Sequence, residues 1–179
     1  MPFEFRELEL AGLILITPKV FGDERGFFME TYKQGDFKKA GITHAFVQAN
    51  HSRSTKGVLR GIHFQRGRSA QGKLVRCTRG EIYDVAVDLR KGSPTYGKWK
   101  GAALSEENKN MLFVPRGFGH GFYTVSEVAE VEYLADNPYD PASEGGVIWN
   151  DPDLNIRWPL RGEPLISEKD SKWPRLKDL

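Results

Sequence analysis

Short runs in which apolar and polar residues alternate, separated by glycine and proline, occupy the first three quarters of the chain. Runs of about four to eight such residues are typical of β-strands rather than helices. The pattern predicts strands at residues 8–16, 26–32, 46–52, 58–65, 73–78, 81–89, 99–104, 111–114, 119–125 and 129–135. Strands at such regular spacing favour an all-β fold, a sandwich or a barrel.

Helical signals are few and short. Residues 36–40 predict one helical turn ended by Gly41, and residues 105–107 predict a second turn with Ser105 as its N-cap. Residues 137–158 are rich in Pro, Gly, Asp and Asn, and the remaining tail has no strand pattern. The prediction is a β-barrel sandwich with a few short helices, covered by a loop-rich C-terminal cap.

Composition narrows the class of protein. The 179 residues fit one domain, residues 1–179, with 26 basic and 24 acidic side chains and a net charge of +2. This balance argues against a general nucleic-acid or membrane-surface role and favours a small ligand. Cys77 is the single cysteine, so no intrachain disulfide can form, and the apolar run at 10–16 is too short to span a bilayer. We therefore expect a cytoplasmic protein.

The stretch G-V-L-R-G-I-H-F-Q at 57–65 carries polar chemistry on a predicted strand. Strict alternation would place His63 and Gln65 on one face, and Arg60, Ile62 and Phe64 on the other. A second stretch, P-R-G-F-G-H-G-F at 115–122, places His120 between two phenylalanines on one face.

The two stretches resemble the two metal-binding motifs of the cupin fold, which predicts a jelly roll. Gln65 stands where the first motif has its second histidine, and the glutamate expected a few residues later is absent. Only His63 and His120 remain of four ligands, whereas a zinc or iron site needs at least three from the protein. We therefore predict no metal, and no motif indicates another cofactor.

His63 is a candidate general base, because imidazole titrates near neutral pH. Either Asp170 or Asp84 could orient it with a carboxylate. The plain alternatives are a hydrogen-bonded core histidine for His63 and, in Ser167-x-x-Asp170, a capping box that only starts a helix.

Tyr133 shares a strand face with apolar residues, so its phenol is predicted to point inward, where it could donate a proton or simply pack in the core. Lys73 begins a strand and could stabilise a developing oxyanion, or lie solvated at the strand end. Arg25, Arg60 and Lys73 suit a diphosphate, and Tyr139, on a proline-flanked loop, could stack on a base.

Seven motifs follow one another along nearly the whole chain. They are D-E-R-G-F-F at 23–28, Q-A-N at 48–50, G-V-L-R-G-I-H-F-Q at 57–65, G-K-L-V-R at 72–76, G-E-I-Y-D-V at 80–85, P-R-G-F-G-H-G-F at 115–122 and S-E-K-D at 167–170. Taken together, these motifs resemble the dTDP-4-dehydrorhamnose 3,5-epimerases, a family of metal-free, cupin-like enzymes of nucleotide-sugar metabolism.

The resemblance implies a role for each matching residue. His63 would remove the protons at C5 and C3 of a 4-keto sugar with Asp170 as its partner, Lys73 would stabilise the enolate, and Tyr133 would return a proton from the opposite face. Tyr139 would stack on thymine. The residues implied to contact the dTDP-sugar are Arg25, Glu30, Gln48, Asn50, Arg60, His120, Glu144 and Lys169. The resemblance also implies a homodimer that exchanges an N-terminal strand.

Epimerisation beside a ketone needs a base on one face, an acid on the other and charge stabilisation at the oxygen between them. The chain offers a candidate for each role. Three alternatives stay open: a 5- or 3-epimerase acting on a related sugar, a non-catalytic cupin that binds sugar nucleotides, and a metal-dependent cupin oxygenase or isomerase, which Gln65 disfavours.

Overall fold

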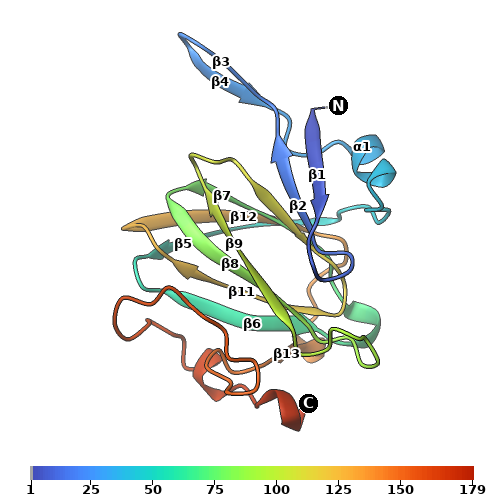
Figure 1. The fold of residues 1–179 in the computed structure, drawn as a ribbon, viewed down its shortest axis with the longest axis vertical. Helices are drawn as coiled ribbons and strands as arrows, with labels where there is room; N and C mark the ends of the chain where they lie inside the picture. The colour runs from blue at the N-terminus through green and yellow to red at the C-terminus, as the bar shows by residue number, and fades with distance from the viewer. Residues whose placement is uncertain (1) are drawn as a thin grey trace.

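Two antiparallel sheets packed face to face form the body of the protein in this computed structural model, which describes residues 2–179. One sheet has six strands in the order β1-β2-β10-β7-β12-β5, and the other has five in the order β13-β6-β11-β8-β9 (Figure 1). A separate two-stranded hairpin, β3-β4, projects from one end of the sandwich. The predicted all-β sandwich is confirmed.

The strands are β1 (Phe3–Glu7), β2 (Ile14–Pro18), β3 (Val20–Asp23), β4 (Gly26–Met29), β5 (Gln48–Thr55), β6 (Leu59–Gln65), β7 (Lys73–Arg79), β8 (Glu81–Asp88), β9 (Trp99–Ser105), β10 (Met111–Val114), β11 (Phe118–Thr124), β12 (Val128–Ala135) and β13 (Glu144–Gly146). The helices are α1 (Gln34–Lys39) and the 3₁₀ turns η1 (Gly67–Ser69), η2 (Pro141–Ser143), η3 (Asp170–Lys172) and η4 (Leu176–Asp178).

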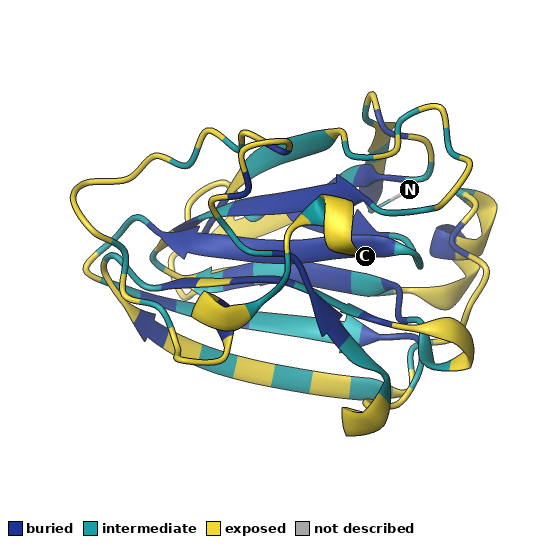
Figure 2. Cartoon of the chain, turned by 90° about the horizontal axis from the view of Figure 1, so that it is seen from below, coloured by how far each residue is buried: buried dark blue, intermediate teal, exposed yellow. Residues whose placement is uncertain are grey.

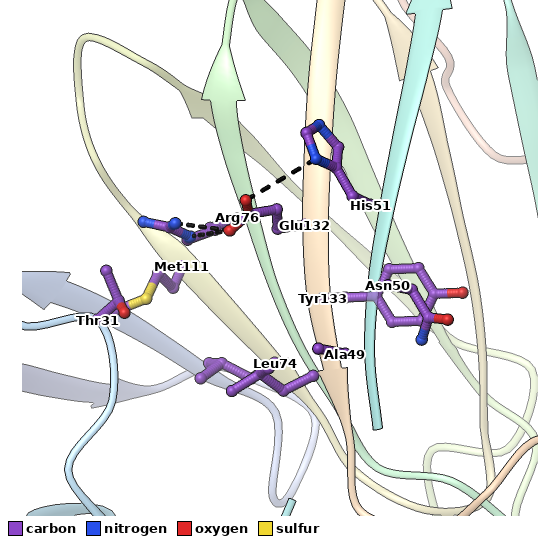
Figure 3. A pocket seen from close by; sticks show the side chains of 10 residues that line it. Thr31, Ala49, Asn50, His51, Leu74, Arg76, Met111, Glu132 and Tyr133 are labelled. Atoms are coloured by element: carbon purple, nitrogen blue, oxygen red, sulfur yellow. Dashed lines mark hydrogen bonds and ion pairs between the residues drawn. The ribbon is translucent and has the colours of Figure 1, made fainter. Parts of the chain in front are cut away.

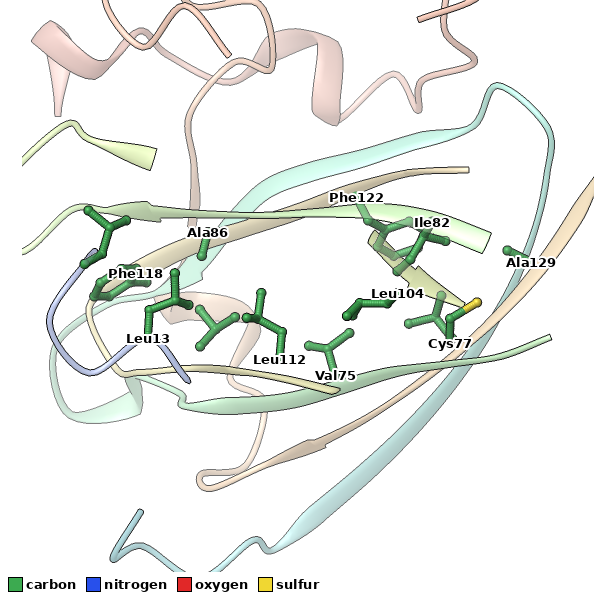
Figure 4. Close-up of a cluster of buried hydrophobic side chains, with 13 residues drawn as sticks. Leu13, Val75, Cys77, Ile82, Ala86, Leu104, Leu112, Phe118, Phe122 and Ala129 are labelled. Carbon is green, nitrogen blue, oxygen red and sulfur yellow. The ribbon is translucent and has the colours of Figure 1, made fainter. Parts of the chain in front are cut away.

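The main core lies between the two sheets. Alternate residues of each strand point inward, so Val75 and Leu112 of one sheet meet Ile82 and Phe122 of the other (Figure 4). Burial of such side chains is the chief source of stability, at about 25 cal/mol per Å² of apolar surface. The core fills one part of the interior and leaves the polar residues of β6, β11 and β12 at its border.

A second hydrophobic core lies on the outer face of the six-stranded sheet, where β1 and β2 meet α1. Phe37 of α1 is fully buried there and contacts Phe3, Phe5 and Tyr32 edge to face. Such aromatic pairs add about 0.5–1.5 kcal/mol beyond the area they bury. They anchor the short helix, which ends before Gly41 as predicted.

The C-terminal segment covers the outer face of the five-stranded sheet. Val147, Leu154 and Leu176 pack against Ile62 and Val87 of that sheet, while the segment itself has little regular structure. Figure 2 shows it as loops around buried strands, with an edge strand of alternating half-buried and exposed residues. The predicted loop-rich cap is therefore confirmed, and it buries a sheet face that would otherwise be apolar and exposed.

Two local predictions are wrong. Residues 8–16 do not form one strand, because Gly12 has a positive φ of 87° and its N–H donates to Glu7 Oε1, which closes a turn between β1 and β2. Ser105 ends β9, and residues 106–108 form a turn and no helix. Ser105 Oγ accepts from the Asn108 N–H, as the predicted N-cap would, and Asn108 Oδ1 accepts from the Ser105 N–H, which closes the turn.

No helix among residues 2–179 is long and apolar enough to cross a membrane.

Candidate active site

His63 and Asp170 form the shortest polar contact of the candidate site. His63 lies near the end of β6, and its Nε2 is 2.6 Å from Asp170 Oδ1. Asp170 begins η3, 107 positions later in the chain, and is almost fully buried. With Nε2–H donating to the carboxylate, Nδ1 is left as the nitrogen that can accept a proton. The contact orients the imidazole as a general base requires.

Asp170 stays ionised because several groups donate to it. Burial alone would raise the pKa of its carboxyl, but the hydrogen bond and charge of His63, with the N–H groups of Gly61 and Trp173, lower it overall. Ser167 Oγ accepts from the Asp170 backbone N–H, which is one half of a capping box. The other half would use the Asp170 carboxylate, which instead accepts from His63, Gly61 and Trp173, so Asp170 does more than start a helix.

Arg60 lies on the same face as His63, which corrects the prediction from strict alternation. His63 pairs with His120 and Arg60 pairs with Phe122, so three steps along β6 match two along β11. A β-bulge of this kind inserts one residue and restores both side chains to one face. Arg60 then reaches across to β5, where its Nε donates to Ser54 Oγ.

A second histidine–aspartate pair lies deeper in the same interior. His120 Nε2 is 2.8 Å from Asp84 Oδ1, and both side chains are buried. Asp84 also acts on Lys73, the first residue of β7. Burial lowers the pKa of Lys73 to about 8, and the negative charges of Asp84 and Glu144 oppose that shift. Lys73 thus presents an enclosed ammonium group, not a solvated strand end.

Tyr133 projects from the opposite sheet into this interior. It packs against the main core, its ring centroid is 5.6 Å from Lys73 Nζ, and it is the cross-strand partner of Asn50. Burial raises the pKa of its phenol, so Tyr133 is a neutral proton donor at neutral pH. Within residues 2–179, Asn50 Nδ2 and Asp84 Oδ2 are buried without a hydrogen-bond partner, which leaves both for a polar ligand.

The border of the site is a chain of polar contacts. The Tyr139 hydroxyl donates to Glu144 Oε2, and Lys169 Nζ donates to Glu144 Oε1 at 2.7 Å. Gln48 Oε1 accepts from the Tyr139 N–H at 2.9 Å, which fixes the loop that carries this half-exposed ring. Burial would raise the pKa of Glu144, but the hydrogen bonds from Lys169 and Tyr139 and the charge of Lys169 lower it overall, with a smaller contribution from His63. This border therefore lies within electrostatic range of His63.

Comparisons with known proteins agree with this geometry. Residues 7–178 match the family described as dTDP-4-dehydrorhamnose 3,5-epimerase. The chain is 56% identical over 168 residues to the enzyme of that name from Salmonella typhimurium, covering 93% of this chain and 92% of the relative. This chain belongs to the dTDP-4-dehydrorhamnose 3,5-epimerase family.

A solved structure extends the match to three dimensions. The epimerase from Legionella pneumophila, in complex with dTDP-4-keto-L-rhamnose, superposes with a TM-score of 0.95 at 45% identity, covering 98% of this chain and 93% of that one. A dTDP-4-dehydrorhamnose 3-epimerase from Streptomyces niveus is 45% identical over 92% of this chain and 80% of its own length. The present chain is accordingly an isomerase of the epimerase class.

Ten of the predicted site residues of this epimerase converge around the interior, together with Asp84 and Tyr139. They are His63, Asp170, Lys73, Tyr133, Gln48, Asn50, Arg60, His120, Glu144 and Lys169. Arg25 and Glu30 do not join them in the single chain. Arg25 lies at the tip of the projecting hairpin and pairs with Asp23, and Glu30 follows β4 (Figure 1).

Two residues of the epimerase acquire positions that the sequence did not reveal. Gln65, considered only as a missing metal ligand, is buried, and its Oε1 accepts from the Asp140 N–H beside Tyr139. The Trp173 indole N–H donates to Asp170 Oδ1. Trp173 follows Asp170 by three residues at the end of a short turn, and this spacing was the signal available in the sequence. Among residues 2–179, no three His, Cys, Asp or Glu side chains cluster as metal ligands would.

A separate cavity of about 270 Å³ lies on the outer face of the six-stranded sheet (Figure 3). Arg76 and Glu132 form an ion pair there at 2.6 Å, beside His51. Because Glu132 and Tyr133 are neighbours on one strand, their side chains point to opposite faces. Asn50 and Tyr133 also line this cavity, while the Tyr133 side chain packs against the core between the two sheets.

Proposed function

We propose that this epimerase inverts C3 and C5 of dTDP-4-dehydro-6-deoxy-D-glucose to give dTDP-4-dehydro-L-rhamnose, a step of dTDP-L-rhamnose biosynthesis. The observation that carries the proposal is the His63–Asp170 pair, which shares one interior with Lys73 and Tyr133 from the facing sheet. Carbons beside a ketone have acidified protons, so a base, an acid and a charge-stabilising group suffice for the inversion.

Each step follows from the position of a side chain. His63 accepts the proton as the C–H bond breaks, and the electron pair moves onto the C4 oxygen as an enolate. The enclosed Lys73 ammonium stabilises that oxygen, because a charge acts more strongly in a dry interior. Tyr133 then returns a proton to the opposite face of the same carbon. His63 and Tyr133 come from opposite sheets, which supports attack from two faces.

Substrate binding is assigned to the border. The half-exposed Tyr139 offers a flat ring for thymine, and the cations Arg60 and Lys169 offer partners for the diphosphate. The sugar would meet Gln48, Asn50, His120 and Glu144. Binding energy from the nucleotide then positions the sugar for reaction.

We further propose a cytoplasmic homodimer in which the β3-β4 hairpin of one protomer reaches the site of the other. The hairpin exposes Phe21, Phe27 and Phe28, with 67% of Phe28 accessible, an apolar surface that favours a protein partner. Arg25 and Glu30 lie on or next to this hairpin and would enter the partner's site. Sedimentation of the protein and of a Phe27→Ser, Phe28→Ser variant tests the assembly, and a monomeric wild type would contradict it.

The central experiment is incubation with dTDP-4-keto-6-deoxyglucose in heavy water, followed by NMR of the sugar. We expect deuterium to replace hydrogen at both C3 and C5, with conversion to the L-rhamno product. Binding of dTDP without exchange at any pH would instead favour a non-catalytic sugar-nucleotide-binding protein.

A narrower activity is the second candidate, because a 3-epimerase is 45% identical to this chain. Such an enzyme can share the base and the acid and differ in how it holds the ring after the first inversion. Deuterium at a single carbon would select this alternative.

A further inference from the structure

Asp170 is held by three protein donors on two oxygens. Its Oδ2 accepts from the Gly61 N–H at 3.3 Å, and its Oδ1 accepts from His63 Nε2 at 2.6 Å and from Trp173 Nε1 at 3.3 Å. His63 and Trp173 therefore share one oxygen. A hydrogen bond from the indole N–H to Oδ1 therefore weakens the interaction of that oxygen with His63.

The indole of Trp173 has a defined seat next to the base. A Cβ placed on Gly146 would lie 2.3 Å from Trp173 Cδ2, so the indole rests directly on the backbone of β13. Gly146 is the β13 partner of His63. The ring centroids of His63 and Trp173 are 6.2 Å apart, with the rings edge to face. Only a glycine leaves room for the indole at this point.

The cap fixes the segment that follows Trp173. The Ile148 N–H donates to the Pro174 carbonyl, and the Leu176 N–H donates to Asp151 Oδ2 at 2.8 Å. Asp151 is buried and also accepts from the Asp153 and Leu154 N–H groups. Trp173 is thus held by Gly146 under its ring and by the hydrogen bonds of the segment that follows it.

We propose that Trp173 is a positioning residue for the epimerisation: its indole N–H fixes Asp170 Oδ1 toward His63 and limits how strongly that oxygen stabilises the protonated imidazole. The inference rests on the proposed role of His63 as the base. An indole donates without accepting, so it can lock a carboxylate without competing for the imidazole proton. A base that must later release its proton benefits from a partner of limited basicity.

The variant that isolates this effect is Trp173→Phe, which keeps an aromatic ring and removes the N–H. We expect kcat to fall about tenfold with KM changed less than about twofold, as is usual when a group that orients a catalytic residue is lost. The acid limb of the pH profile of kcat should move up by about half a pH unit, because Oδ1 then stabilises the imidazolium more strongly.

Trp158→Phe is the matched control. Trp158 also lies in the cap and donates its indole N–H, but to the Trp149 carbonyl and away from the pair. Its loss should lower thermal stability by a similar amount and leave kcat and the acid limb unchanged. If Trp173→Phe resembles Trp158→Phe in every kinetic readout, Trp173 is a packing residue and the proposal is wrong.

A measurement without substrate separates this proposal from the proposed function. The titration midpoint of His63, followed by NMR in the protein alone, should rise in Trp173→Phe even if the wild type epimerises nothing. In the wild type, the indole N–H resonance of Trp173 should shift as His63 titrates, whereas that of Trp158 should not. A Trp173 resonance that stays constant would overturn the proposal, also where the variant fails to fold.

Discussion

The two histidine–aspartate pairs of this epimerase have the same chemistry and different surroundings. The side chain of His63 is 28% exposed and that of His120 is 8% exposed. Asp170 comes from the C-terminal cap and accepts from three donors, whereas Asp84 comes from the neighbouring strand β8 and, among residues 2–179, leaves Oδ2 without one. The outer imidazole is accessible for proton exchange with a ligand, whereas the inner pair is buried and offers Asp84 Oδ2 as a hydrogen-bond acceptor.

The difference shows what each pair is suited to do. An accessible imidazole with a saturated carboxylate can gain and lose a proton without rearranging its partner. The inner carboxylate instead acts on a neighbouring cation: burial lowers the pKa of Lys73, and the negative charge of Asp84 opposes that shift. We therefore propose proton transfer for the outer pair and charge placement for the inner pair.

The strongest test of this division is His63→Asn. We expect proton exchange at both sugar carbons to fall by about 10³-fold, because the base is gone, with dTDP binding nearly unchanged. Solvent deuterium incorporation and calorimetric titration with dTDP measure the two quantities. His51→Asn is the control, since His51 also pairs with a carboxylate, Glu130, but on the outer face. Exchange near the wild-type rate in His63→Asn would remove His63 as the base.

A smaller effect should separate proton removal from proton return. Tyr133→Phe keeps the ring and deletes the acid, so net epimerisation should fall by about 10²-fold while deuterium exchange falls much less. The two rates can be read from one NMR time course. Equal losses in both would mean that Tyr133 acts elsewhere in the cycle.

The mildest and most discriminating effect concerns pH. Activity should fall as pH rises through about 8, where Lys73 loses its proton. Asp84→Asn removes a charge that raises the pKa of Lys73, so this alkaline limb should move down by about one pH unit. Asp170→Asn should instead move the acid limb down, because the imidazolium loses its counter-charge. Profiles of kcat/KM from about pH 5 to 10 measure both limbs.

The same profiles can contradict the comparison. If both aspartate variants move the same limb, the pairs are not divided in function. If Asp84→Asn leaves the alkaline limb in place, Lys73 is not the group that titrates there.

Most of the fold could be predicted from periodicity, because strands with one buried face impose a two-residue pattern on the sequence. This pattern predicted that Tyr133 points inward and that Gln48 and Asn50 share a face, as the structure shows. Arg60 did not, since a bulge shifts the pattern by one residue and leaves no composition signal.

The sequence also could not predict which histidine and aspartate form a hydrogen bond when they are far apart in the chain. Asp170 and Asp84 were equal candidates for His63, because periodicity says nothing about which loop folds over which strand. In the structure, Asp170 forms a hydrogen bond with His63, and Asp84 forms one with His120. The resemblance to a family ranked these options, and the hydrogen bonds decided between them.

Because Asp170 lies in the C-terminal cap, the ribosome synthesises it after the strands of both sheets. All thirteen strands, the last of which ends at Gly146, leave the ribosome before Asp170 does, and the His63–Asp170 contact joins residues 107 positions apart. A nascent chain can therefore assemble both sheets while its histidine still lacks a carboxylate. Translation would deliver a folded scaffold first and a competent catalyst only with the final segment.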